Sequence, residues 1–135
     1  MDPDRVVTRI IVETSIAGRS GEEHFRAAYL EYLDELARQN SHGSSGAAPR
    51  FVLLSPIAWE PTGNPLWPDA AERNRHLRRY AEIVAEVARE RGLAYVDLFT
   101  PTEPLFAAEP GMQHTINGCH LNEAGDREVA LLLDR

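Results

Sequence analysis

The chain has 135 residues, of which 43% are hydrophobic, and a formal net charge of −7. This length supports one hydrophobic core, so we expect a single domain over residues 1–135. Nucleic-acid surfaces normally carry a basic patch and a membrane span needs about 18 consecutive apolar residues, so the acidic balance and the lack of such a run argue against both partners.

The first predicted element is a strand at Val6–Val12, which is rich in β-branched residues. A turn at Glu13–Gly18 follows it. Ser20 and Glu23 then form a capping box that predicts the start of a helix. Apolar side chains recur at helical spacing after it: Phe25, Ala28, Tyr29, Tyr32, Leu33 and Leu36. The serine- and glycine-rich stretch 40–49 predicts a flexible surface loop.

A second strand is predicted at Phe51–Leu54, which is apolar on both faces, as parallel strands covered by helices tend to be. The proline-rich stretch 59–68 indicates an irregular loop. Asp69 and Glu72 predict the N-terminus of the next helix, and Gly92 its end. The apolar stripe of that helix is Leu77, Tyr80, Ala81, Val84, Val87 and Ala88.

A third strand is predicted at Ala94–Phe99, followed by a long loop, Thr100–Gly118, and a last helix from about Glu123 to Leu133 with Asn122 as its N-cap. Alternating strands and helices are typical of an α/β fold, in which right-handed crossovers join the strands of a parallel sheet. We therefore expect a parallel sheet of about three strands with flanking helices.

A histidine, His120, stands three residues after Asn117 in a glycine-containing turn, directly before the last helix. Loops held by a rigid neighbour often present catalytic groups, and histidine changes charge near neutral pH. His120 is therefore a candidate catalytic residue. The alternative is a partly buried histidine that only completes the loop.

The stretch Asn117-Gly118-Cys119-His120-Leu121-Asn122 resembles the last conserved block of the SGNH (GDSL-type) hydrolases, Asp-x-x-His. Segments Val12–Gly18, Leu54–Glu60 and Val96–Phe99 follow the order expected for the later two thirds of such a domain. The resemblance implies a three-layer, flavodoxin-like domain that is only partial in this chain. It also implies that His120 is the general base and that Asn117 orients it, where the family has aspartate.

The family's Gly-Asp-Ser nucleophile block is not evident, and residues 13–18 align with the family in two ways. If they match its third block, Glu13 and Thr14 take the substrate-binding positions and the chain lacks the nucleophile. If they are a diverged nucleophile block, Ser15 is the nucleophile. We favour the first alignment because its distance to the strand end at Ser55 fits the family. Glu13 is then a poor oxyanion stabiliser, since a carboxylate repels the charge that needs support.

The resemblance implies a serine hydrolase that removes acetyl or acyl groups from an ester of a small molecule, a lipid or a carbohydrate. Without a nucleophile block we expect weak activity or none. The alternative is a non-catalytic remnant or a binding module of the same fold. We expect no cofactor and no metal, because His114, Cys119 and His120 have no second ligand pair at usable spacing.

The strand at Val6–Val12 would expose a bare sheet edge if no earlier strands pair with it, so we expect another chain or a local rearrangement to cover it. A homo-oligomer through this edge is one way to do so. Residues Met1–Asp4 are acidic and no apolar signal-peptide region follows them. The default expectation is therefore a cytoplasmic location.

Overall fold

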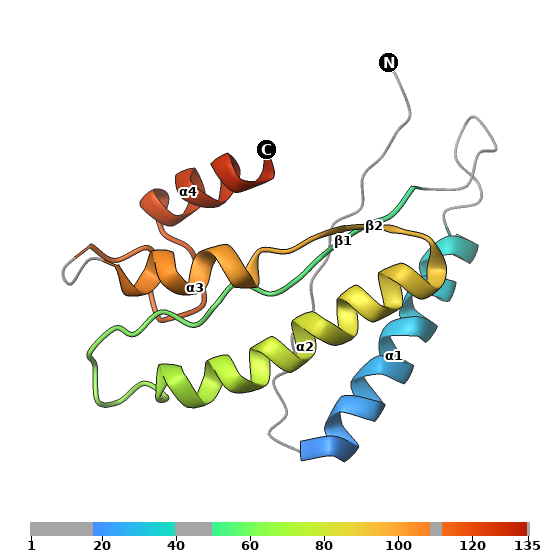
Figure 1. Ribbon diagram of the computed structural model, residues 1–135, viewed down its shortest axis with the longest axis horizontal. Coiled ribbons are helices and arrows are strands. Elements are labelled where there is room, and N and C mark those ends of the chain that lie inside the picture. Colours follow the sequence, from blue (N-terminus) through green and yellow to red (C-terminus); the bar gives the residue numbers. More distant parts are fainter. Residues whose placement is uncertain (1–17, 40–49, 109–111, 135) are drawn as a thin grey trace.

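The computed structural model describes residues 18–39, 50–108 and 112–134. Its elements (Figure 1) are α1 (Gly18–Gln39), β1 (Val52–Leu54), α2 (Ala70–Arg91), β2 (Ala94–Val96), α3 (Phe99–Ala107) and α4 (Glu123–Leu133). The described part of the chain is thus an α/β domain with a two-stranded parallel sheet and four helices. None of these helices is long and apolar enough to cross a membrane.

The two strands pair in parallel, with Val52 opposite Ala94 and Leu54 opposite Val96. α2 forms the crossover between them, as the alternating pattern predicted. β2 ends at Val96 and not at Phe99, because α3 begins there. The predicted strand at residues 6–12, with its edge, lies outside the described residues, and so does the predicted loop at 40–49.

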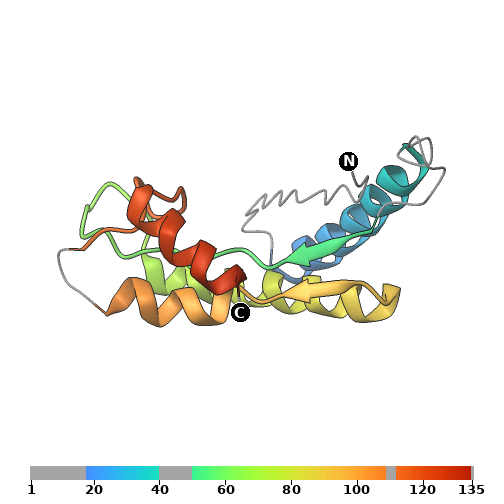
Figure 2. The same ribbon diagram turned by 90° about the horizontal axis from the view of Figure 1, so that it is seen from above.

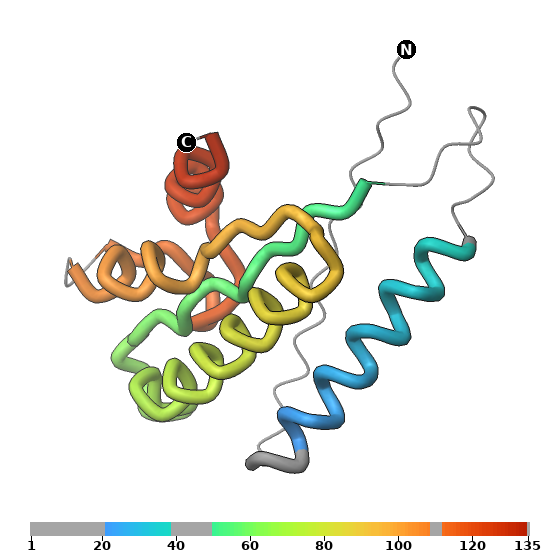
Figure 3. The backbone as a smooth tube through the Cα atoms, turned by 45° about the vertical axis from the view of Figure 1, so that its right-hand side comes forward, coloured from blue at the N-terminus to red at the C-terminus, as the bar shows by residue number. Residues whose placement is uncertain are grey.

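Helix α2 packs against both strands, and α1 packs against α2. Figures 1 and 3 place α4 on the opposite side of the strands from α2. Seen from above, α1 and the strands lie toward one end of the molecule, while α3 and α4 lie toward the other (Figure 2). We call these the strand end and the site end.

The strand end has an apolar and aromatic core between α1, α2 and the sheet. Its buried members are Leu33, Leu53, Tyr80, Ile83, Val84, Val87 and Ala88. Phe25 of α1 meets the ring of Tyr80 edge-on at 4.8 Å between centroids. Ion pairs join the two helices at the surface: Arg26–Glu90, Arg79–Glu22 and Arg91–Asp34. Most of the two predicted stripes therefore meet in this core, but Leu77 and Ala81 of α2 belong to the core of the site end, and Ala28 of α1 is exposed.

The caps of α2 lie where the sequence predicted them. The Asp69 carboxylate accepts the N–H of Glu72 at 2.8 Å. Gly92 adopts the left-handed conformation, with φ of 63°, and its N–H reaches the carbonyls of Ala88 and Arg89. The start of α1 differs from prediction, since the helix begins at Gly18 and thus includes Ser20, the expected N-cap.

Helix α3 covers the first part of the predicted long loop, Thr100–Gly118, so the loop prediction was wrong for residues 100–107. The helix contains two prolines, which disfavour a helix prediction from the sequence. Pro101 falls in the first turn, where a missing N–H costs nothing, and Pro104 removes one bond from the interior of a short helix. Burial of Phe99 and Phe106 in the core of the site end stabilises the helix despite that loss.

Candidate active site

The segment from His114 to Asn122, which we call the histidine loop, is closed at its base. The N–H of Asn122 donates to the carbonyl of His114 at 2.9 Å, and Thr115 and Leu121 form an antiparallel bridge. Asn122 also caps α4 as predicted, because its Oδ1 accepts the N–H of Gly125 at 3.0 Å. The helix that follows the loop therefore fixes its position.

Asn117 and His120 are in contact at the tip of this loop. Oδ1 of Asn117 lies 2.9 Å from Nδ1 of the imidazole and accepts the backbone N–H of His120 at 3.0 Å. A backbone N–H can only donate, so this amide atom is the oxygen and not the NH₂ group. The ring nitrogen facing the same oxygen must then carry a hydrogen. In the neutral ring, the lone pair is on Nε2.

The orientation of His120 suits a base that acts outward. Its side chain is exposed, and within the described part of the chain the hydrogen bonds of the ring all involve Nδ1. Nε2, which carries the lone pair, is left for a substrate or nucleophile. Asn117 thus fixes the tautomer, as an aspartate would, but it brings no negative charge to stabilise an imidazolium.

A hollow of about 690 Å³ opens beside His120. Most of its lining is apolar and comes from the loop after β1 (Ile57 and Trp59), from α2 (Leu77), from the residue before α3 (Leu98) and from α4 (Val129). One acidic side chain, Asp126, also contributes. Concave apolar surfaces with a few polar groups are the usual form of small-molecule sites.

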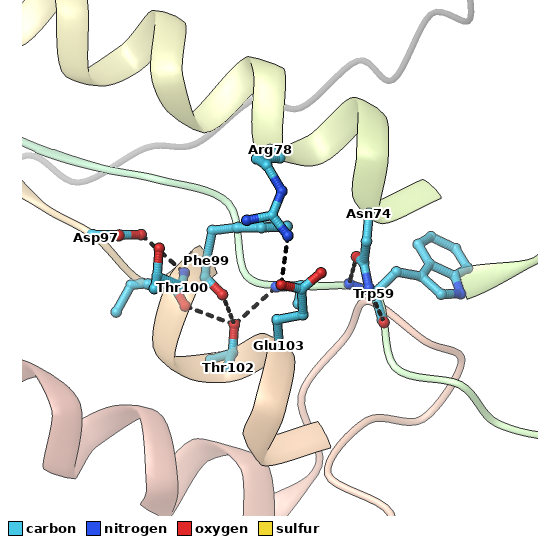
Figure 4. Close-up of polar contacts among 10 residues, drawn as sticks. Trp59, Asn74, Arg78, Asp97, Phe99, Thr100, Thr102 and Glu103 are labelled. Carbon is cyan, nitrogen blue, oxygen red and sulfur yellow. Dashed lines mark hydrogen bonds and ion pairs between the residues drawn. The ribbon is translucent and has the colours of Figure 1, made fainter. Parts of the chain in front are cut away.

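The indole of Trp59 supports the tip of the histidine loop. Gly118 has φ of 95°, and a Cβ atom there would lie 2.5 Å from the indole, so only glycine fits. Asn74 of α2 binds both backbone groups of Trp59. Its Oδ1 accepts the Trp59 N–H at 2.7 Å, and its NH₂ donates to the Trp59 carbonyl at 3.1 Å (Figure 4). The guanidinium of Arg73 lies 5.5 Å from the ring centroid.

Glu60 is the most buried charged side chain in the described residues, with 2% of its surface exposed. Its Oε1 accepts the N–H of His114 and its Oε2 accepts the N–H of Thr115, each at 2.7 Å. The Thr115 hydroxyl also donates to Oε2. From the sequence alone, no role is predicted for Glu60. The available signal was a carboxylate directly after the apolar run from Ile57 to Trp59, just beyond a strand.

Cys119 lies beside the histidine but is not activated by it. Its Sγ is 3.4 Å from the same Nδ1 that faces Asn117, so the two side chains compete for one nitrogen. Burial raises the pKa of the Cys119 thiol, and the positive charge of Arg73 opposes that shift only in part. A raised pKa disfavours the thiolate, which is the nucleophilic form.

Ser55 is the one serine whose side chain the described residues include, and it has a structural role. It is completely buried, and its Oγ accepts the N–H groups of Leu98 and Phe99 at 2.8 Å each. It therefore joins the end of β1 to the start of α3 and has no access to a substrate.

The other predicted site residues, Ser15, Glu13 and Thr14, lie outside the described residues, so their distances to His120 are not defined. Within the described ranges, no group of three or more histidine, cysteine, aspartate or glutamate side chains is arranged to hold a metal ion. The described part of the site thus consists of the His120–Asn117 pair and the hollow beside it.

The model of the GDSL-like Lipase/Acylhydrolase family matches residues 15–128 of the chain. The chain belongs to this family. Comparison with curated proteins and with solved structures gave no match. The chain is therefore a GDSL-like, hydrolase-like domain, and its family match spans both the histidine loop and the loop after β1. The predicted resemblance is confirmed at the level of the family.

Proposed function

We propose that this GDSL-like domain hydrolyses acyl or acetyl esters, with His120 as the general base and Asn117 as its orienting partner. Ser15 is the candidate nucleophile if residues 13–18 are a diverged nucleophile block; if they match the family's third block, Glu13 and Thr14 take the substrate-binding positions and the chain lacks a nucleophile. The substrate is an ester of a small molecule, a lipid or a carbohydrate.

The observation that carries this proposal is the pair of contacts to one amide oxygen. Oδ1 of Asn117 accepts the backbone N–H of His120 at 3.0 Å and faces its Nδ1 at 2.9 Å. In the neutral ring this arrangement leaves the lone pair on Nε2, which takes part in none of the ring's hydrogen bonds within the described residues. A histidine that only completed a loop would need neither the partner nor an exposed ring.

The reaction follows from that proton position. As the serine oxygen forms a bond to the ester carbonyl, Nε2 of His120 accepts the hydroxyl proton. The imidazolium returns this proton to the departing alkoxide, which leaves as the alcohol. A water molecule then repeats the sequence on the acyl-enzyme, releases the acid and restores the serine.

We expect a slow enzyme, because Asn117 cannot stabilise the imidazolium electrostatically. In a serine protease, replacing the orienting aspartate by asparagine lowers kcat by about 10⁴-fold, which corresponds to about 5.5 kcal/mol. Part of that loss comes from a wrong tautomer. The tautomer in this domain is set by the Asn117 oxygen, so the deficit should be smaller than in the protease.

The apolar lining of the hollow supports an acyl or alkyl group as its occupant. Each methylene group buried from water contributes about 0.8 kcal/mol, or about fourfold in kcat/KM. We therefore expect p-nitrophenyl butyrate to react faster than the acetate. Equal rates for the two esters would mean that the acyl chain does not enter the hollow.

A fluorophosphonate probe tests the mechanism, because it reacts covalently with an activated serine. We expect labelling of the folded protein that is absent in Ser15→Ala and strongly reduced in His120→Ala. His24→Ala is the matched control, since His24 is an exposed histidine on α1, far along the chain from the loop. Its labelling should equal that of the parent protein.

Mass spectrometry of the labelled peptide locates the modified residue. Absence of any label on the folded protein would overturn serine hydrolysis by this chain and leave the binding-module alternative. A label that persists in His120→Ala would remove His120 from the mechanism.

A further inference from the structure

Glu60 is a buried acidic side chain that contacts the histidine loop, which carries the candidate base. Glu60 follows Trp59 in the loop after β1, and its side chain reaches the first residues of the histidine loop. With 2% of its surface exposed, it has no access to the hollow. Its oxygens accept two backbone N–H groups, from His114 and Thr115, and the Thr115 hydroxyl.

Further hydrogen bonds connect Glu60 and Thr115 to Gly118 at the tip of the loop. Oγ1 of Thr115 donates its hydrogen to Glu60, which leaves a lone pair that accepts the N–H of Gly118 at 2.9 Å. The backbone N–H of Glu60 donates to the carbonyl of Gly118 at 2.8 Å. Both backbone groups of Gly118 are therefore held by Glu60, directly or through Thr115.

Gly118 lies between Asn117 and Cys119, so its fixed peptide planes set the direction in which the Asn117 side chain leaves the backbone. The indole of Trp59 blocks movement on one side, since even a Cβ at Gly118 would lie 2.5 Å from it. The Asn117 oxygen can then meet both Nδ1 and the backbone N–H of His120.

We propose that Glu60 is a positioning residue for the candidate base: through Thr115 and Gly118 it holds the Asn117 oxygen against Nδ1 of His120. This inference rests on the proposed function for its catalytic meaning. Its structural content, a defined tautomer of His120 that depends on Glu60, is measurable without any hydrolysis.

The readout is the tautomer of His120 in long-range ¹H–¹⁵N spectra of histidine-labelled protein, assigned with His120→Gln. In the parent protein we expect the form protonated at Nδ1. In Glu60→Gln, the amide NH₂ faces backbone N–H groups, so one anchoring bond is lost. We expect the ring to lose its preference and approach the mixture of a free imidazole.

Two substitutions at Thr115 test the same hydrogen-bonded connection from Glu60 to Gly118 with a smaller perturbation. Thr115→Ser keeps the hydroxyl and should keep the tautomer. Thr115→Val has a similar shape without the hydroxyl and should lose it. If Glu60→Gln does not fold, this pair decides the question alone.

Val87→Ala separates positioning from general loss of stability. Val87 is fully buried in the core of the strand end, so its truncation lowers the thermal midpoint without touching the histidine loop. We expect its His120 tautomer to match that of the parent. A folded Glu60→Gln or Thr115→Val protein with an unchanged tautomer would overturn the proposal, as would an equal change in Val87→Ala.

If the domain hydrolyses esters, the same variants should lower kcat more than they raise KM. A displacement of about 1 Å at a reacting group can cost about 100-fold in rate. An absence of hydrolysis in the parent protein would contradict the proposed function and leave the tautomer result standing, so the two failures are distinguishable.

Discussion

The strand end and the site end of the molecule are stabilised in different ways. The strand end buries apolar and aromatic side chains between α1, α2 and the sheet, with ion pairs at its surface. The buried polar side chains of the described residues belong to the site end: Ser55, Glu60, Asn74, Thr102, His114 and Thr115. Apolar burial is non-directional, whereas hydrogen bonds fix orientation. The site end thus combines burial with precise placement of side chains.

The largest expected effect is on catalysis, and it should leave the strand end unchanged. Asn117→Asp restores a carboxylate beside Nδ1 of His120 and adds the missing stabilisation of the imidazolium. We expect hydrolysis of p-nitrophenyl esters to rise by at least about 10-fold but by less than the roughly 10⁴-fold cost of the reverse change in a serine protease, because the Asn117 oxygen already sets the tautomer. Steady-state kinetics measures it. An unchanged rate in a folded variant would argue against His120 as the base.

A pair of glycine substitutions tests how tightly the two ends are packed. Alanine normally stabilises a helix relative to glycine by about 1 kcal/mol. In α4, however, a Cβ at Gly125 would lie 2.1 Å from the backbone oxygen of His114. We expect Gly125→Ala to lower the free energy of unfolding by about 3 kcal/mol or more, since helix and loop must separate.

Gly92→Ala is the comparison at the strand end. A Cβ there meets open space, and only the left-handed backbone opposes the change. The expected loss is about 1–2 kcal/mol. Urea unfolding of both variants gives the difference, and a Gly92→Ala loss equal to that of Gly125→Ala would contradict the packing contrast.

The sequence predicts some helices of this fold and misses another. Periodicity and capping residues located α2, α4 and their caps, because apolar stripes and the side chains of Asp69 and Asn122 act locally. Periodicity missed α3, whose stability comes from burial of Phe99 and Phe106 and not from its proline-containing sequence.

In the candidate site, the sequence predicted which residues are neighbours in one turn, and the roles of these residues stay predictions. Asn117 and His120 lie close in sequence, and their contact follows from one turn. Glu60 is 54 residues from His114, and Asn74 is 15 from Trp59. Such bonds depend on how the loops meet in space, and no local pattern encodes them.

Asn74 gives a smaller effect that again belongs to the site end. Asn74→Leu keeps a similar shape but leaves the N–H and carbonyl of Trp59 without their partner. We expect a loss of about 2 kcal/mol, because an unsatisfied buried polar group costs about 1–3 kcal/mol. In a Trp67→Phe background, indole fluorescence in a urea titration should also report a more mobile Trp59. A stability equal to that of the parent protein would show that the two hydrogen bonds between Asn74 and Trp59 contribute nothing to folding.

The smallest effect is expected at the strand end, from the ion pair between Asp34 and Arg91. The hydrogen bond from Arg91 lowers the pKa of the Asp34 carboxyl. A lowered folded-state pKa stabilises the fold above the ordinary carboxyl pKa, and this contribution disappears as the pH falls below about 4. Thermal midpoints of Arg91→Gln and the parent protein should therefore differ slightly at pH 7 and converge in acid. A difference that grows in acid would refute this account.

The closed base of the histidine loop has a consequence for how the domain tolerates change. The bond from Asn122 to His114 and the bridge between Thr115 and Leu121 tie the two ends of the loop to each other. The shape of the loop is therefore independent of the connection that leads into it. Residues inserted ahead of Gln113 would lengthen that connection without displacing the imidazole, which makes this point of the chain a suitable place to graft a tag or a second domain.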